Sequence, residues 1–128
     1  MKIFLAEDDK NIFTIAKMAL EQLGGHTVTH VDNGEAALEL LLQQGHEFDV
    51  ILLDEMMPGL NGLAVCEQYT QQINHPQPVI FLSAKSQASD VKDFSRLGQG
   101  FIPKPFDPTQ LCQQIENILN QVRTETAV

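Results

Sequence analysis

Short apolar segments alternate with stretches of helical periodicity along the chain, and this alternation limits the possible folds more than any other feature. Apart from residues 27–31, these segments lack the polar alternation of half-exposed strands, which indicates strands buried on both faces. They predict strands at 2–6, 27–31, 50–53, 79–82 and 101–102. Apolar residues spaced three and four apart predict helices at 12–23, 34–45, 63–73, 86–97 and 108–122.

Parallel strands joined by helical crossovers form a sheet that helices cover on both faces. A chain of 128 residues fits one domain of this kind. We therefore predict an α/β fold, a doubly wound parallel five-stranded sheet, over residues 1–123, followed by a short polar tail at 124–128. In such sheets ligands bind beyond the carboxyl ends of the strands.

Charge and hydropathy exclude several classes of function. The net charge is −9, from 8 basic and 17 acidic side chains, and such a surface repels nucleic acid phosphates. We expect no direct nucleic acid binding by this chain. No apolar run approaches the roughly 20 residues of a membrane span, and the N-terminus is too acidic for a signal peptide. We therefore expect a cytoplasmic protein without a membrane anchor.

The first, third, fourth and fifth predicted strands are followed, within one or two places, by polar residues of possible chemical use. Asp54 follows the fully apolar run 50–53, which can hold its carboxylate rigidly at the sheet edge. The residues after the first, fourth and fifth strands are Glu7, Asp8 and Asp9, then Ser83 and Ala84, then Lys104 and Pro105. Because the carboxyl ends of parallel strands share one edge, these side chains are expected to meet there.

Clustered carboxylates at this edge need a cation or a proton. Two carboxylates about 4 Å apart repel by roughly 4 kcal/mol at an effective dielectric of 20. Oxygen ligands without Cys or His favour a hard ion, and few ligands at an open rim favour Mg²⁺ over Ca²⁺. Together with Lys104 and Ser83, this set suits phosphoryl transfer to Asp54. The competing interpretation is an ordinary solvated surface of acids and lysines.

Four spaced motifs extend this interpretation by resemblance. They are FLAEDD at 4–9, DVILLDEMMPGLNG at 49–62, FLSA at 81–84 and FIPKPF at 101–106. In this order they resemble the receiver domain of two-component response regulators over essentially the whole chain. The resemblance implies the flavodoxin-like (βα)5 fold with strand order 2-1-3-4-5.

The resemblance also implies individual roles. Asp54 is implied as the phosphoacceptor, and Mg²⁺, for which Mn²⁺ could substitute, as the cofactor. The implied metal site uses Asp8 directly, Glu7 through water, Asp54 and the backbone carbonyl of Met56. The implied phosphoryl contacts come from Ser83, the Ala84 backbone and Lys104.

Further residues have implied structural or switching roles. Ser83 and Phe101 match a switch pair, with Ser in place of the commoner Thr and Phe in place of Tyr. For Phe101, ordinary core packing is an alternative role. Pro58 and Gly62 match the loop after the acceptor, and the Lys104–Pro105 bond is often cis in the family. Asp9 falls outside the metal site and is better explained as the residue that starts a helix.

The predicted function is that of a phosphoacceptor in His-Asp signalling. The implied partners are a histidine kinase or histidine phosphotransfer protein and a downstream protein effector, with the chain a monomer or a phosphorylation-dependent dimer. We do not expect a turnover enzyme: phosphatases of the haloacid dehalogenase type need a second Asp where this chain has Met56. A receiver-like module that binds partners without phosphorylation is the other alternative. The chain is either a stand-alone receiver or part of a longer regulator.

Overall fold

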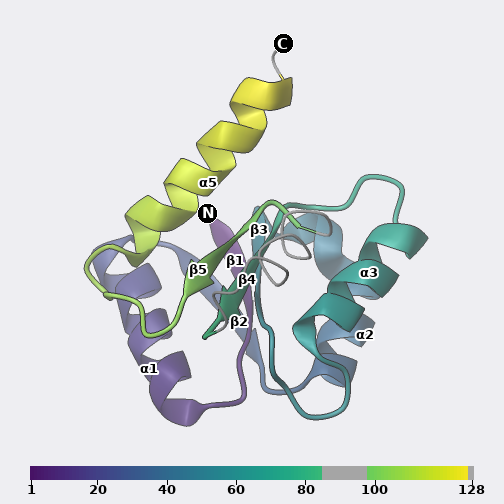
Figure 1. The fold of residues 1–128 in the computed structure, drawn as a ribbon, viewed down its shortest axis with the longest axis horizontal. Coiled ribbons are helices and arrows are strands. Elements are labelled where there is room, and N and C mark those ends of the chain that lie inside the picture. The colour runs from purple at the N-terminus through teal and green to yellow at the C-terminus, as the bar shows by residue number, and fades with distance from the viewer. Residues whose placement is uncertain (85–97, 127–128) are drawn as a thin grey trace.

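The computed structural model describes residues 1–84 and 98–126, and its centre is one parallel sheet (Figure 1). The strand order is β2-β1-β3-β4-β5, which confirms the predicted doubly wound fold. The strands are β1 (Lys2–Ala6), β2 (Thr27–Val31), β3 (Val50–Asp54), β4 (Val79–Ser83) and β5 (Gly100–Pro103). Each lies within one residue of its predicted bounds, although β2 has no buried residue and is not an apolar run.

Helices cover both faces of the sheet. They are α1 (Lys10–Met18) with a π-helical turn η1 (Ala19–Leu23), α2 (Gly34–Gln44) with a 3-10 turn η2 (Gly45–Glu47), α3 (Gly62–Gln72) and α5 (Leu111–Thr126). In Figure 1, α1 and α5 lie on one side of the sheet, and α2 and α3 lie on the other. The helix predicted at 86–97 lies outside the described residues.

Alternation along the central strands divides the core into two clusters. Ile3 and Leu5 of β1 pack toward α1 and α5, whereas Phe4 and Ala6 pack toward α2 and α3. All five residues of β3 are buried, so this strand is covered on both faces as predicted. The charged end of β3 is therefore held on a rigid, fully packed support.

Polar side chains start three of the helices. Asp9 accepts hydrogen bonds from the backbone N–H groups of Asn11 and Ile12, which confirms its predicted role at the start of a helix. Asn33 and Asn61 cap α2 and α3 in the same way. These caps fix where each loop at the carboxyl edge of the sheet enters its helix.

The apolar stripe predicted at 12–23 is only partly buried. Ala16 and Leu20 are buried, but Ile15 is 40% exposed and Leu23 is 64% exposed. The α-helix gives way to π-helical turns at Ala19, and the wider turn rotates Leu23 off the buried face. Ile15 lies at the flank of the stripe, where no described helix packs.

The last helix also differs from its predicted bounds. It begins at Leu111, and Pro108 lies in the preceding turn instead of at the helix start. Asp107 organises this turn, because its side chain accepts hydrogen bonds from Thr109. The helix runs to Thr126, past residue 124 where the sequence predicted a tail. Within the described part of the chain, every helix is too short or too polar to cross a bilayer.

Candidate functional site

Asp54 is the last residue of β3, at the carboxyl edge of the sheet. The residue is 4% exposed, and the N–H of the next residue, Glu55, donates to the carbonyl of Leu82 in β4. Behind the backbone of Asp54 lies Gly62, where an added Cβ would stand 2.4 Å from the Asp54 carbonyl oxygen. A close approach of α3 to the acid-bearing strand therefore requires glycine at position 62.

Glu7 and Asp8 occupy the turn between β1 and α1. The backbone N–H of Glu7 donates to Val31 in β2, and the Glu7 side chain accepts from the N–H of Asp9. Glu7 is 1% exposed, whereas Asp8 is exposed. The two neighbouring acids therefore differ in environment: one is held inside the site, and the other stands at its mouth.

The structure brings Glu7, Asp8 and Asp54 together, with one carboxylate oxygen of each within 4.8 Å of the others. Strand order explains the meeting, because β1 and β3 are neighbours with Ala6 in register with Leu53. An all-carboxylate donor set at an open rim fits a hard divalent cation. These three residues could hold such an ion, as the sequence predicted for the edge of the sheet.

Lys104 reaches the same carboxylates from β5. Its Nζ donates a hydrogen bond to Asp54 Oδ1 at 2.9 Å and lies 2.7 Å from Glu7 Oε1. No described residue donates a well-directed hydrogen bond to the buried Glu7 Oε1, so the contact with Lys104 is an ion pair. That oxygen therefore keeps capacity for a further partner. The Lys104–Pro105 peptide is cis, as the resemblance implied.

The pKa values reflect this crowding. Burial raises the pKa of the Asp54 carboxyl above its usual range, Glu7 adds to the rise, and Lys104 offsets it only in part. Burial lowers the pKa of the Lys104 amine, but the carboxylates of Asp54 and Glu7 outweigh burial and raise it overall. The site thus keeps a charged amine beside an acid that holds its proton more tightly than usual.

Ser83 and Phe101 come from the next two strands. Ser83 ends β4 and is 1% exposed, and its carbonyl accepts the backbone N–H of Lys104. Phe101 is partly buried and packs against the cluster beneath α2 and α3. This packing matches the alternative role that the sequence allowed for Phe101. The switching role of the pair stays a prediction.

An acid pocket of about 230 Å³ collects these groups. It is lined by Glu7, Asp8, Asp9, Ile12, Asp54, Glu55, Met56, Ser83, Ala84 and Lys104. The Met56 side chain, 68% exposed, stands at its rim, and the Met56 N–H donates to Asp54 Oδ1. The use of the Met56 carbonyl as a ligand stays a prediction.

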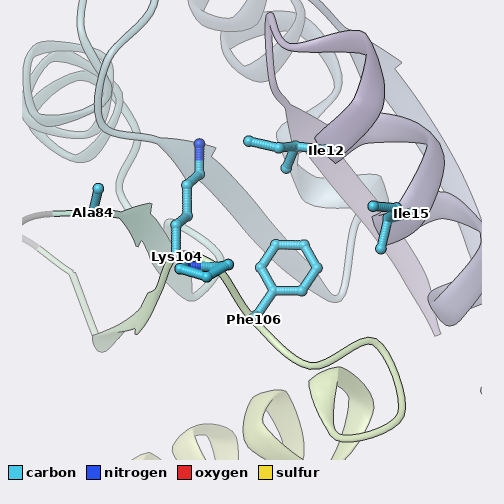
Figure 2. A pocket seen from close by; sticks show the side chains of 6 residues that line it. Ile12, Ile15, Ala84, Lys104 and Phe106 are labelled. Carbon is cyan, nitrogen blue, oxygen red and sulfur yellow. The ribbon is translucent and has the colours of Figure 1, made fainter.

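A second hollow, the apolar pocket, adjoins the acid pocket and has a volume of about 350 Å³. It is lined by Ile12, Ile15, Ala84, Lys104, Pro105 and Phe106. Figure 2 shows Ile12 and Ile15 on α1 facing the Phe106 ring, with the Lys104 side chain along one wall and its amine pointing away. The sequence does not reveal this pocket. By its spacing Ile15 fits the buried stripe of the first helix, and Phe106 stands out only as the last residue of the motif at 101–106.

The fold and site define an open α/β protein with an acidic pocket at the carboxyl ends of its strands. The chain belongs to the response regulator receiver domain family, whose model matches residues 3–116. It is therefore a receiver domain of two-component response regulators, as the sequence motifs had indicated.

Individual relatives agree with this assignment. The chain is 36% identical over 129 residues to the nisin biosynthesis regulatory protein NisR of Lactococcus lactis subsp. lactis, covering 99% of this chain and 54% of that protein. It is similar to the solved BeF3-activated DrrB receiver domain, with a TM-score of 0.76, 28% identity, and 93% and 97% of the two chains covered. The chemotaxis protein CheY4 of Vibrio cholerae shares the fold, with a TM-score of 0.78, 22% identity and coverage of 91% and 97%. The chain spans about half the length of the curated relatives it matches.

Proposed function

We propose that Asp54 is the phosphoacceptor of this receiver and takes its phosphoryl group from a phosphohistidine on a partner protein. One observation carries the proposal. Asp54 lies beside the carboxylates of Glu7 and Asp8 and is hydrogen-bonded to the Lys104 amine. An aspartate at the rim of a fully buried strand is a rigidly held nucleophile. The family assignment supports the same chemistry.

The transfer step follows from these positions. A carboxylate oxygen of Asp54 attacks the phosphorus in line, and an O–P bond forms as the P–N bond to the donor imidazole breaks. The leaving imidazole keeps the electron pair and, if it departs as an anion, takes a proton from solvent. Lys104 moves its charge from the Asp54 carboxylate to the phosphoryl oxygens, and the Ser83 hydroxyl and Ala84 N–H donate to the same oxygens.

A divalent cation belongs to this proposal. Asp8, Asp54 and the Met56 carbonyl would hold Mg²⁺, with Glu7 acting through water, and Mn²⁺ would substitute. The all-oxygen donor set of three clustered carboxylates supports the fit. When bound, the ion supplies positive charge that neutralises the transferring phosphoryl group.

Phosphorylation would then act as a switch. The product adds about −1.5 to −2 charge at the strand ends, by analogy with other phosphorylated side chains. Ser83 turns toward that charge and Phe101 follows, which biases a surface that includes β5 and α5. A downstream effector reads that surface. Water later removes the phosphoryl group, and Met56 offers no acid or base for rapid turnover.

The apolar pocket supports a protein donor. It shares Ile12, Ala84 and Lys104 with the acid pocket, so a protein that presents a histidine to Asp54 also covers this hollow. Ile15 is 40% exposed and would gain from burial by an apolar side chain of that donor. A small phosphodonor needs only the acid pocket.

Incubation with Mg²⁺ and acetyl phosphate, followed by intact-mass measurement, tests the proposal. We expect one added phosphoryl group on the wild type and none on Asp54→Asn. Chelation of the cation should prevent the addition. A phosphoryl group that persists on Asp54→Asn would reject this acceptor, and rapid hydrolysis of p-nitrophenyl phosphate would favour a phosphatase instead.

A further inference from the structure

His30 lies in β2, an outermost strand of the sheet, and contacts the turn between β1 and α1 that carries Glu7 and Asp8. Its Nε2 lies 2.8 Å from the backbone carbonyl oxygen of Glu7. Its ring stacks on Phe13 of α1, with ring centroids 3.6 Å apart and planes inclined by 14°. One imidazole thus contacts both the end of β1 and the first turns of α1.

The hydrogen bond fixes the form of the ring. A carbonyl oxygen can only accept, so the Nε2 of His30 carries the proton and donates it to Glu7. Stacking on Phe13 holds the imidazole in the plane that this bond requires. The two contacts therefore support each other.

The bond reaches the peptide group that leads into Asp8. The N–H of Glu7 is held by the carbonyl of Val31, and its carbonyl is held by His30. Because a peptide group is planar, fixing the Glu7 carbonyl also fixes the direction in which the chain enters Asp8.

Asp8 depends on this support more than its neighbours do. Glu7 is buried against Lys104, and Asp9 is held by its capping bonds, but no described residue donates a hydrogen bond to the Asp8 carboxylate. The backbone at Asp8 therefore fixes the position and direction of its Cα–Cβ bond, from which the carboxylate reaches the ion.

We propose that His30 is a positioning residue for the divalent cation: through the Glu7 carbonyl it orients the Glu7–Asp8 peptide and thus the Asp8 carboxylate. Phe13 is the platform that holds the ring. The proposal rests on the metal site of the proposed function and adds a residue that touches neither ion nor phosphoryl group. Partners of metal ligands commonly contribute in this way to affinity.

Two substitutions separate the hydrogen bond from the ring. His30→Phe keeps an aromatic ring on Phe13 but cannot donate, whereas His30→Gln keeps a donor. Mg²⁺ affinity is measured by calorimetry on the full chain, with urea unfolding in EDTA to verify folding. We expect His30→Phe to weaken Mg²⁺ binding about tenfold and His30→Gln to recover most of the loss.

The exposed His75, in the loop before β4 at the opposite sheet edge, gives the matched control His75→Phe, which should bind Mg²⁺ like the wild type.

Kinetics add a readout that a merely structural role would not produce. The Mg²⁺ concentration for half-maximal phosphorylation by acetyl phosphate should rise in His30→Phe, while the maximal rate at saturating Mg²⁺ stays near wild type. Unchanged Mg²⁺ affinity in His30→Phe would overturn the proposal, as would His30→Gln binding as weakly as His30→Phe.

A wild-type measurement guards against a variant that fails to fold. The nitrogen-15 spectrum of the His30 imidazole should show a proton on Nε2, and a ring protonated only on Nδ1 would overturn the proposal. Failure of the proposed function is distinguishable: Asp54 would then take no phosphoryl group, yet the shifts in Mg²⁺ affinity would remain.

Discussion

Two neighbouring hollows on either side of the Lys104 side chain have opposite chemistry. The acid pocket contains the clustered carboxylates of Glu7, Asp8 and Asp54 and the Lys104 amine, and the apolar pocket is walled by Ile15, Pro105 and Phe106. One side chain serves both, because the stem of lysine is apolar and only its end is charged (Figure 2). The difference suggests that phosphoryl transfer depends on the acid pocket and contact with a protein donor on the apolar pocket. Substitutions in one pocket should therefore leave the role of the other unchanged.

Loss of the lysine charge should have the largest effect on the acid pocket. We expect Lys104→Met to lower the free energy of unfolding by about 3 kcal/mol, because Glu7 and Asp54 stay buried without their shared cation. Urea unfolding in EDTA measures the loss, and added Mg²⁺ should recover part of it. Lys17→Met is the control, because that amine is exposed and has two weak contacts, a 4.0 Å pair with Glu21 and a 5.9 Å approach to the centroid of the Phe13 ring. If Lys104→Met and Lys17→Met lose the same free energy of unfolding, the ion pairs of Lys104 do not stabilise the acid pocket.

A steric change should distort the acid pocket without altering its charge. Gly62→Ala places a Cβ against the Asp54 carbonyl oxygen, and we expect it to cost about 2 kcal/mol of stability and to slow phosphorylation by acetyl phosphate. Gly100→Ala is the matched control, because its added Cβ meets only the Ile118 side chain, 3.3 Å away. If both variants unfold alike, close backbone contact behind Asp54 does not matter.

The apolar pocket should affect only protein donors. We expect Ile15→Ser to slow phosphoryl transfer from a phosphorylated histidine protein about tenfold, because an exposed apolar contact of the donor is lost. The rate with acetyl phosphate should not change. Leu23→Ser, at another exposed apolar position on η1, should leave both rates unchanged. An equal loss with both donors would remove the distinction between the two hollows.

The smallest effect concerns pH in the cation-free protein. Because the pKa of Asp54 is raised on folding, the folded state binds the proton more tightly than the unfolded chain. Stability should therefore rise as pH falls through the raised pKa and should stop rising below the ordinary value of 3.8. Urea unfolding in EDTA across this range, wild type against Asp54→Asn, isolates the contribution. If the wild type instead loses stability relative to Asp54→Asn as pH falls over this range, the pKa of Asp54 is not raised on folding and the prediction is wrong.

Local patterns determined the elements and the residues at their ends. Apolar runs marked β3 and β4 to within one residue, and the cap at Asp9 followed from its position before a periodic stretch. These features depend on neighbours in the sequence, so they are visible without the fold. The positions of Asp54, Asp8 and Lys104 at strand ends indicated a phosphoryl-transfer site, and the motifs then assigned each residue its role.

The tertiary structure decided which of these residues touch and which faces stay open. Lys104 and Asp54 are fifty positions apart, and their hydrogen bond exists because β3, β4 and β5 lie side by side in that order. The order of residues alone does not show that Glu7 is buried against Lys104 or that its neighbour Asp8 is exposed. Nor did it separate Ile15 from the buried stripe, because periodicity describes a helix face and not what packs on it. Contacts of this kind depend on strand order and helix placement, which are properties of the whole chain.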